Sequence, residues 1–184
     1  MQTETFIAIA VIAALAILVI AAFAVINEKR RSQHLQDRFG PEYERATSRT
    51  DDKRKAEREL MEREWRVRSL RLRDLPREQQ ERFADEWRRA QARFVDDPSQ
   101  AIREADALVQ RVMEARGYPT TGFEQQAADL SVDHAELVQN YRLAHAIALR
   151  EEDGEASTED LRQAMVHYRS LFAELLGAAP AGVS

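Results

Sequence analysis

The feature that most constrains this chain is a run without a single polar side chain, from Phe6 to Ile26. At the helical rise of 1.5 Å per residue such a run reaches about 30 Å, the thickness of the hydrocarbon core of a bilayer. A helix satisfies its own backbone hydrogen bonds in lipid, so the run predicts one transmembrane helix. We therefore expect a short tail at 1–5, a span at 6–26, and a membrane lipid bilayer as one partner.

Charge beside this run predicts its orientation. The tail before it carries Glu4 and no Lys or Arg, whereas the segment after it carries four bases: Lys29, Arg30, Arg31 and Arg38. Lys and Arg near a span are retained in the cytoplasm, so we expect a single-pass cell-membrane protein with its N-terminus outside and its C-terminal domain cytoplasmic. A cleaved secretory signal is disfavoured by the missing basic n-region and the long apolar run. An uncleaved anchor with an extracytoplasmic C-terminal domain stays the alternative.

Composition removes several function classes. The chain has no cysteine, which excludes a disulfide framework, a Cys-based zinc site and a thiol nucleophile. Residues 28–93 hold 20 Lys and Arg against 15 Asp and Glu, whereas residues 94–184 hold 7 against 16. We interpret both charge runs as solvated helix faces, with the basic half next to anionic lipid. Nearly all the bases are Arg, which is typical of a GC-rich bacterial genome, so we expect no nucleic-acid partner.

Residues 27–75 predict a basic juxtamembrane stalk. Gly40-Pro41 should break the helix that leaves the span, since Gly is flexible and Pro lacks an amide proton. From Glu42 to Arg68 the chain is charged and polar, and we expect either a stalk helix or a partly disordered stalk, weakest at Thr47–Asp52. Ser69–Leu75 begins by alternating Leu with Arg, which is typical of a short extended piece.

Apolar stripes at helical spacing predict an all-α, antiparallel bundle of about four helices over 76–177. We expect a short additional helix over 123–130 and a flexible tail at 178–184. Asp97-Pro98 predicts a capped helix start, and Gly117 predicts a helix end. Ser157 with Asp160 three residues later predicts a capping box on the last helix.

The histidines are the candidates for chemistry. His134 and His145 lie on one side of the same expected helix but about 16 Å apart along its axis, too far to share a metal ion. Neither a Glu-x-x-His pair nor HExxH occurs, and the Gly-rich phosphate loops and GxSxG are absent. We therefore assign no catalytic, cofactor-binding or metal residues. The alternative is a metal-binding or enzymatic bundle that uses His134, His145, His167 and nearby carboxylates.

We expect the chain to act as a membrane-anchored interaction or scaffold module with a protein partner. Polar side chains gather towards one end of the expected bundle and form the predicted partner surface: Asp129, Asp133, His134, Asn140 and Arg142.

Several segments carry a resemblance: RFGPEY (38–43), ARFVDDP (92–98), EADALVQRVMEARGYP (104–119), FEQQAADLSVDH (123–134), YRLAHAIA (141–148) and ASTEDLRQAMVHYRSLF (156–172). The run from Arg93 to Leu176 resembles an uncharacterised family of small bacterial membrane proteins, common in GC-rich Gram-positive bacteria. The resemblance implies a single span followed by a helical domain. It implies no activity, cofactor or partner.

Overall fold

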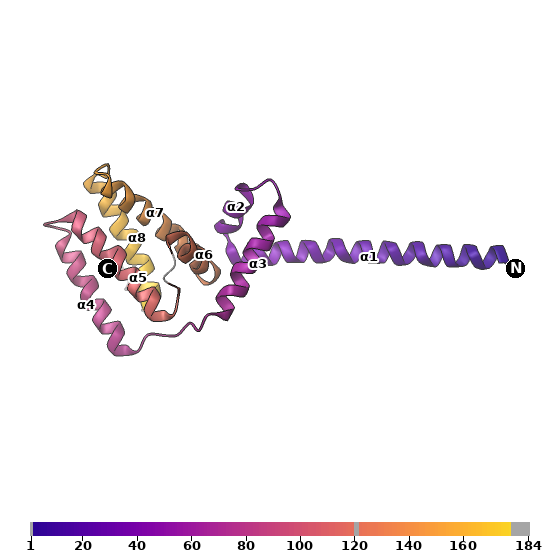
Figure 1. Cartoon of the computed structure of the whole chain (residues 1–184), viewed down its shortest axis with the longest axis horizontal. Helices are drawn as coiled ribbons and strands as arrows, with labels where there is room; N and C mark the ends of the chain where they lie inside the picture. Colours follow the sequence, from indigo (N-terminus) through magenta and orange to yellow (C-terminus); the bar gives the residue numbers. More distant parts are fainter. Residues whose placement is uncertain (1, 120–121, 178–184) are drawn as a thin grey trace, which may run out of the picture. The chain divides into compact units, whose positions relative to one another are not determined.

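The computed structural model describes residues 2–119 and 122–177, with the side chains of the first helix described from Leu15 onward. Within these ranges every regular element is a helix, from α1 to α8 (Figure 1). The predicted all-α class is therefore confirmed. The chain divides into two compact units, residues 1–57 and 58–184, so the second unit begins within the segment predicted as a stalk.

The first unit contains α1 (Gln2–Phe39), α2 (Pro41–Ser48) and the first turn of α3 (Lys53–Ser69). Gly40 separates α1 from α2 with a positive φ of 46°, a conformation that glycine adopts without steric cost. The predicted helix break is therefore confirmed. The segment predicted to be weakest, Thr47–Asp52, contains the end of α2 and the non-helical link to α3.

A buried carboxylate joins the three helices of this unit. Glu57 accepts hydrogen bonds from the Ser32 hydroxyl at 2.6 Å and the Tyr43 hydroxyl at 2.9 Å. Lys53 Nζ lies 3.7 Å from the same oxygen. Burial raises the pKa of Glu57, but these hydrogen bonds and the nearby cation outweigh it, so the pKa lies below its usual range. One carboxylate oxygen therefore connects residues of all three helices in this unit.

The transmembrane prediction requires correction. Among the residues whose side chains are described, we find no helix that combines the length and the apolar character needed to cross a bilayer. A helix needs about 20 consecutive apolar residues to cross a hydrocarbon core of about 30 Å.

This finding contradicts the predicted localisation as a single-pass membrane protein, in either orientation. The predicted transmembrane helix at 6–26 is unsupported, and the bilayer partner rested on it. The first part of that predicted span, residues 6–14, lies outside the residues whose side chains are described, as does the predicted tail at 178–184.

The second unit holds the predicted bundle. Helices α5, α7 and α8 pack against one another, α4 lies on α5 and α8, and α6 lies on α7 (Figure 1). Short connections between successive helices make antiparallel packing the natural arrangement. The bounds are α4 Arg77–Arg93, α5 Pro98–Arg116, α6 Phe123–Asp133, α7 Ala135–Glu152 and α8 Thr158–Leu176.

Local sequence signals begin and end these helices as predicted. The Asp97 carboxylate accepts a hydrogen bond from the backbone N–H of Gln100 at the start of α5. Ser157 and Asp160 form the predicted capping box at the start of α8. Gly117 ends α5 with φ 97°, and a Cβ there would lie 2.8 Å from the carbonyl oxygen of Arg71. Glycine is therefore required at this position both by its φ and by the available space.

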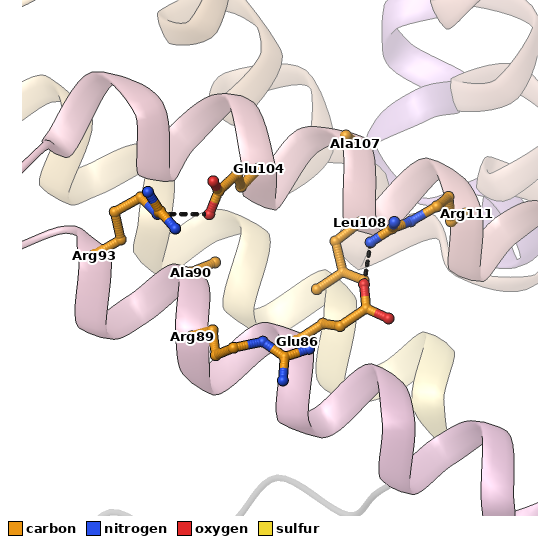
Figure 2. Close-up of a pocket in the computed structure, with 8 residues that line it drawn as sticks. All are labelled: Glu86, Arg89, Ala90, Arg93, Glu104, Ala107, Leu108 and Arg111. Atoms are coloured by element: carbon orange, nitrogen blue, oxygen red, sulfur yellow. Dashed lines mark hydrogen bonds and ion pairs between the residues drawn. The ribbon is translucent and has the colours of Figure 1, made fainter.

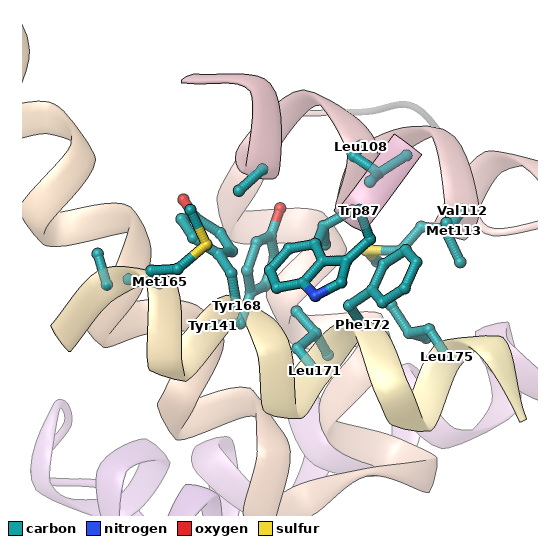
Figure 3. Close-up of a cluster of buried hydrophobic side chains, with 14 of the residues drawn as sticks. Trp87, Leu108, Val112, Met113, Tyr141, Met165, Tyr168, Leu171, Phe172 and Leu175 are labelled. Carbon is teal, nitrogen blue, oxygen red and sulfur yellow. The ribbon is translucent and has the colours of Figure 1, made fainter. Parts of the chain in front are cut away.

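The core is aromatic and apolar. Trp87 of α4 stacks on Phe172 of α8, with ring centroids 4.8 Å apart (Figure 3). Tyr141 and Tyr168 are fully buried, and their hydroxyls donate to Gln126 at 3.1 Å and to Asp106 at 2.7 Å. Phe83 and Phe94 are partly buried against the same core.

Candidate interaction groove

An open groove of about 330 Å³ lies between α4 and α5. Its floor is small and apolar, and charged side chains stand along both edges (Figure 2). We call it the α4–α5 groove, and its lining is Glu86, Arg89, Ala90, Arg93, Glu104, Ala107, Leu108 and Arg111.

One spacing, used on both helices, builds the groove. Helix α4 carries Glu86 and then Arg93 seven residues later, and α5 carries Glu104 and then Arg111 at the same interval. Seven residues are about two helical turns, so each pair lies on one face of its helix. The two helices run antiparallel, which places each glutamate opposite the arginine of the other helix.

An ion pair therefore lies towards each end of the groove. Arg93 Nε is 3.1 Å from Glu104 Oε2, and Arg111 Nη2 donates to Glu86 Oε2 (Figure 2). The two arginine side chains are about half exposed, at 52% and 55%. Contacts this exposed are screened by water, so both pairs are weak and exchangeable.

Arg89 adds a third cation between these ends. Its side chain is exposed, and within the described part of the chain no hydrogen bond or ion pair holds its guanidinium. Three arginines and two glutamates give the groove a net positive charge, whereas the whole chain carries a net charge of −5. The groove is thus a local basic site on an acidic protein.

The predicted partner surface contains a residue that the fold buries. Asp129 has no exposed side-chain surface; its Oδ1 accepts from Arg66 Nε at 2.9 Å and from Gln125 Nε2 at 2.8 Å. This contact links the end of α3 to α6. A carboxylate so placed acts within the fold, because it cannot be reached by a partner without opening that contact.

The other predicted surface residues also have contacts within the unit. The imidazole of His134 is 3.4 Å from Glu174, but burial lowers the pKa of His134, so this contact joins a neutral ring to a carboxylate at pH 7. Arg142 is 9% exposed and pairs with Glu124 at 3.2 Å. Asn140 bonds the ring of His167, and the exposed Asp133 also has a partner. Their role as a partner surface stays a prediction.

The three bundle histidines are held in different places. His145 stacks on Phe123 with centroids 3.7 Å apart, and its Nδ1 lies 3.9 Å from Asp106. His134 contacts Glu174, and His167 contacts Asn140. Across residues 15–119 and 122–177 we find no group of three His, Asp or Glu side chains that could hold a metal ion.

The basic residues predicted to follow a span lie on α1, and all four are exposed: Lys29, Arg30, Arg31 and Arg38. Lys29 lines a shallow hollow of about 490 Å³ in the first unit, together with Glu28, Gln33 and Lys53. Its described lining has two lysines and one glutamate, and it contains no arginine that could hold a carboxylate in a planar fork.

Sequence reasoning missed the α4–α5 groove. Its signal was the Glu and Arg seven residues apart on two successive helices, which becomes visible only when the antiparallel packing of those helices is assumed. Without that packing, the same charges indicate only solvated helix faces.

Comparison with family models, with curated proteins and with solved structures gave no match to this chain. The resemblance of Arg93–Leu176 to small bacterial membrane proteins therefore stays a prediction.

Proposed function

We propose that the chain is a helical interaction module that docks a protein partner in the α4–α5 groove. The observation that carries this proposal is the third arginine, Arg89, which stands exposed beside two arginines that already have acidic partners. Because no hydrogen bond or ion pair holds the Arg89 guanidinium within the described residues, a partner can bind it without breaking an internal interaction.

The shape of the groove supports a polypeptide rather than a small molecule. Ligand pockets for small molecules enclose most of their occupant and are mainly apolar and aromatic. This groove is open, its rim is charged, and its floor consists of Ala90, Ala107 and Leu108. An apolar floor with a polar rim is the common anatomy of a protein–protein contact.

The alternative, a metal-binding or enzymatic bundle built on His134, His145 and His167, gains no support from the described residues. Each ring contacts a different neighbour, and the contacts are those of side chains that link helices to one another. We therefore retain the interaction module as the proposed function.

Site-specific photo-crosslinking of the full chain in its native host tests the proposal. Ala107, exposed in the groove, is replaced by a photoreactive phenylalanine analogue, and Arg169, exposed on α8, is replaced in the control. We expect a discrete crosslinked product from position 107 and none from position 169. Equal labelling at both positions, or no product from position 107, would refute docking in this groove.

A further inference from the structure

From the groove's charges we infer that the occupant is an acidic, extended segment of the partner, and that Glu86 and Glu104 are its internal competitors. This inference rests on the proposed function and specifies the chemistry of the partner. The groove is the one described above, with Arg89, Arg93 and Arg111 as the binding cations.

Spacing along α4 defines the pattern of the segment. Arg89 and Arg93 are four residues apart, which is about 6 Å along a helix axis. In an extended chain, residues i and i+2 lie about 6.6 Å apart and point the same way. Two acidic residues separated by one other residue therefore match the two arginines. A third acidic residue, two positions beyond the one that meets Arg89, lies on the side of Glu86 and comes within reach of Arg111.

The floor allows such a segment to lie close. Ala90 and Ala107 end at their Cβ atoms, and Leu108 is almost fully buried beneath them. The backbone of the segment can approach the helices between the charged edges, while its carboxylates reach the arginines. Arginine has five N–H donors in a planar fork, which suits a carboxylate.

The two internal glutamates compete for these donors. Glu86 and Glu104 are each about one-third exposed, and each holds an arginine that the incoming carboxylates would bind. Exposed ion pairs contribute little individually, so exchange for a partner's carboxylates is cheap. Removal of either glutamate should therefore strengthen binding, an effect that a purely structural ion pair would not produce.

The test measures fluorescence anisotropy of a labelled peptide, Gly-Glu-Ser-Glu-Ser-Glu-Gly, with the full chain at low ionic strength. A peptide of the same composition with consecutive glutamates, Gly-Glu-Glu-Glu-Ser-Ser-Gly, controls for spacing, and one with Gln in place of Glu controls for charge. Residues 28–93 carry more Lys and Arg than Asp and Glu, so substitutions within the groove, rather than binding alone, show where the peptide lies. We expect the alternating peptide to bind most tightly.

Paired variants then identify the residues. Arg89→Ala should weaken binding about fivefold, whereas Arg88→Ala, on the same helix and paired with Asp85, should leave it unchanged. Glu86→Gln and Glu104→Gln should each strengthen binding about twofold to fivefold. Glu81→Gln removes the same charge at an ion pair with Arg77 outside the groove, and should have no effect.

The outcomes separate this inference from the proposed function. If Arg88→Ala weakens binding as much as Arg89→Ala, or if Glu86→Gln and Glu104→Gln weaken it, the inference is wrong. If no peptide binds but crosslinking from position 107 persists, the groove docks a partner of different chemistry, and only the inference falls. If both experiments fail, both proposals fall.

Discussion

The α4–α5 groove and the interior of the second unit use similar residues for opposite purposes. In the interior, Asp129 meets Arg66 and Tyr168 meets Asp106, and these groups are buried or half-buried. Along the groove, Arg93 and Arg111 meet glutamates at half-exposed positions. Burial raises the cost of separating a polar pair, whereas water makes an exposed pair replaceable. The same chemistry therefore joins helices in one region and offers an exchangeable surface in the other.

The largest expected effect is an alkaline loss of stability from the buried tyrosines. Burial, with Asp133 nearby, raises the pKa of Tyr118 from 10.0 to about 12, and burial also raises the pKa of Tyr141 and of Tyr168. Above pH 10 the unfolded chain releases these protons while the folded chain keeps them. The contribution of the tyrosines to the free energy of unfolding is therefore fully present below pH 10 and decreases as the pH rises. Each tyrosine contributes a slope of about 1.4 kcal/mol per pH unit.

Urea denaturation between pH 9 and pH 11 measures this slope. Tyr118→Phe should reduce it, because one of the three protons is then absent, and Tyr168→Phe should do the same. An unchanged slope in both variants would show that the interior tyrosines do not differ from exposed ones.

The next effect concerns Asp129. Asp129→Ala leaves Arg66 and Gln125 without their acceptor, and because Arg66 is partly exposed it can still reach water. We expect the free energy of unfolding to fall by about 3 kcal/mol in urea denaturation. Glu159→Ala removes a carboxylate from an exposed pair with Arg162, and serves as the matched control with an expected loss much smaller than that of Asp129→Ala. Similar losses for the two variants would erase the proposed contrast.

The capping box should give an intermediate effect. Ser157→Ala removes the hydroxyl that accepts from the backbone N–H of Asp160 at the start of α8. We expect the free energy of unfolding to fall by about 1 kcal/mol, measured by thermal denaturation, and Ser157→Asp to restore most of it. Equal stability of Ser157→Ala and the unmodified chain would mean that packing alone holds this end of α8.

The smallest effects should come from the groove. Arg89→Ala, Glu86→Gln and Glu104→Gln should each change the free energy of unfolding by about 0.5 kcal/mol or less. The same urea titrations give these values, and they also establish that any change in peptide binding is not a change in folding. A loss above 2 kcal/mol in any of these variants would show that the groove charges stabilise the fold as strongly as the buried polar pairs do.

Much of the bundle could be predicted from the chain alone, because its signals are local. The break at Gly40-Pro41, the cap at Asp97 and the capping box at Ser157 depend on residues within one or two helical turns. Trp87 lies on the apolar stripe of its helix, and it is buried against Phe172. The spacing of apolar residues indicates which face of a helix is apolar, and that face is expected to pack against the core.

The polar residues show where prediction from the chain stops. In the sequence, Asp129 looks like an accessible acid near the end of a helix. In the structure it is buried and accepts a hydrogen bond from Arg66, which is far away in the sequence. The prediction of a membrane span depended on the apolar run alone, and the described helices do not bear it out. A local pattern does not state which distant residue will meet a given charge.

What the sequence determined by itself is the all-α character, the helix ends and the apolar faces of the bundle, since each depends on backbone hydrogen bonding and side-chain spacing within a single helix. Tertiary structure alone decided which charges became internal contacts and which formed a groove. Glu86 and Arg111 lie 25 residues apart in the chain, and they meet because two antiparallel helices pack on a shared core. Packing therefore selected the surface on which the proposed function depends.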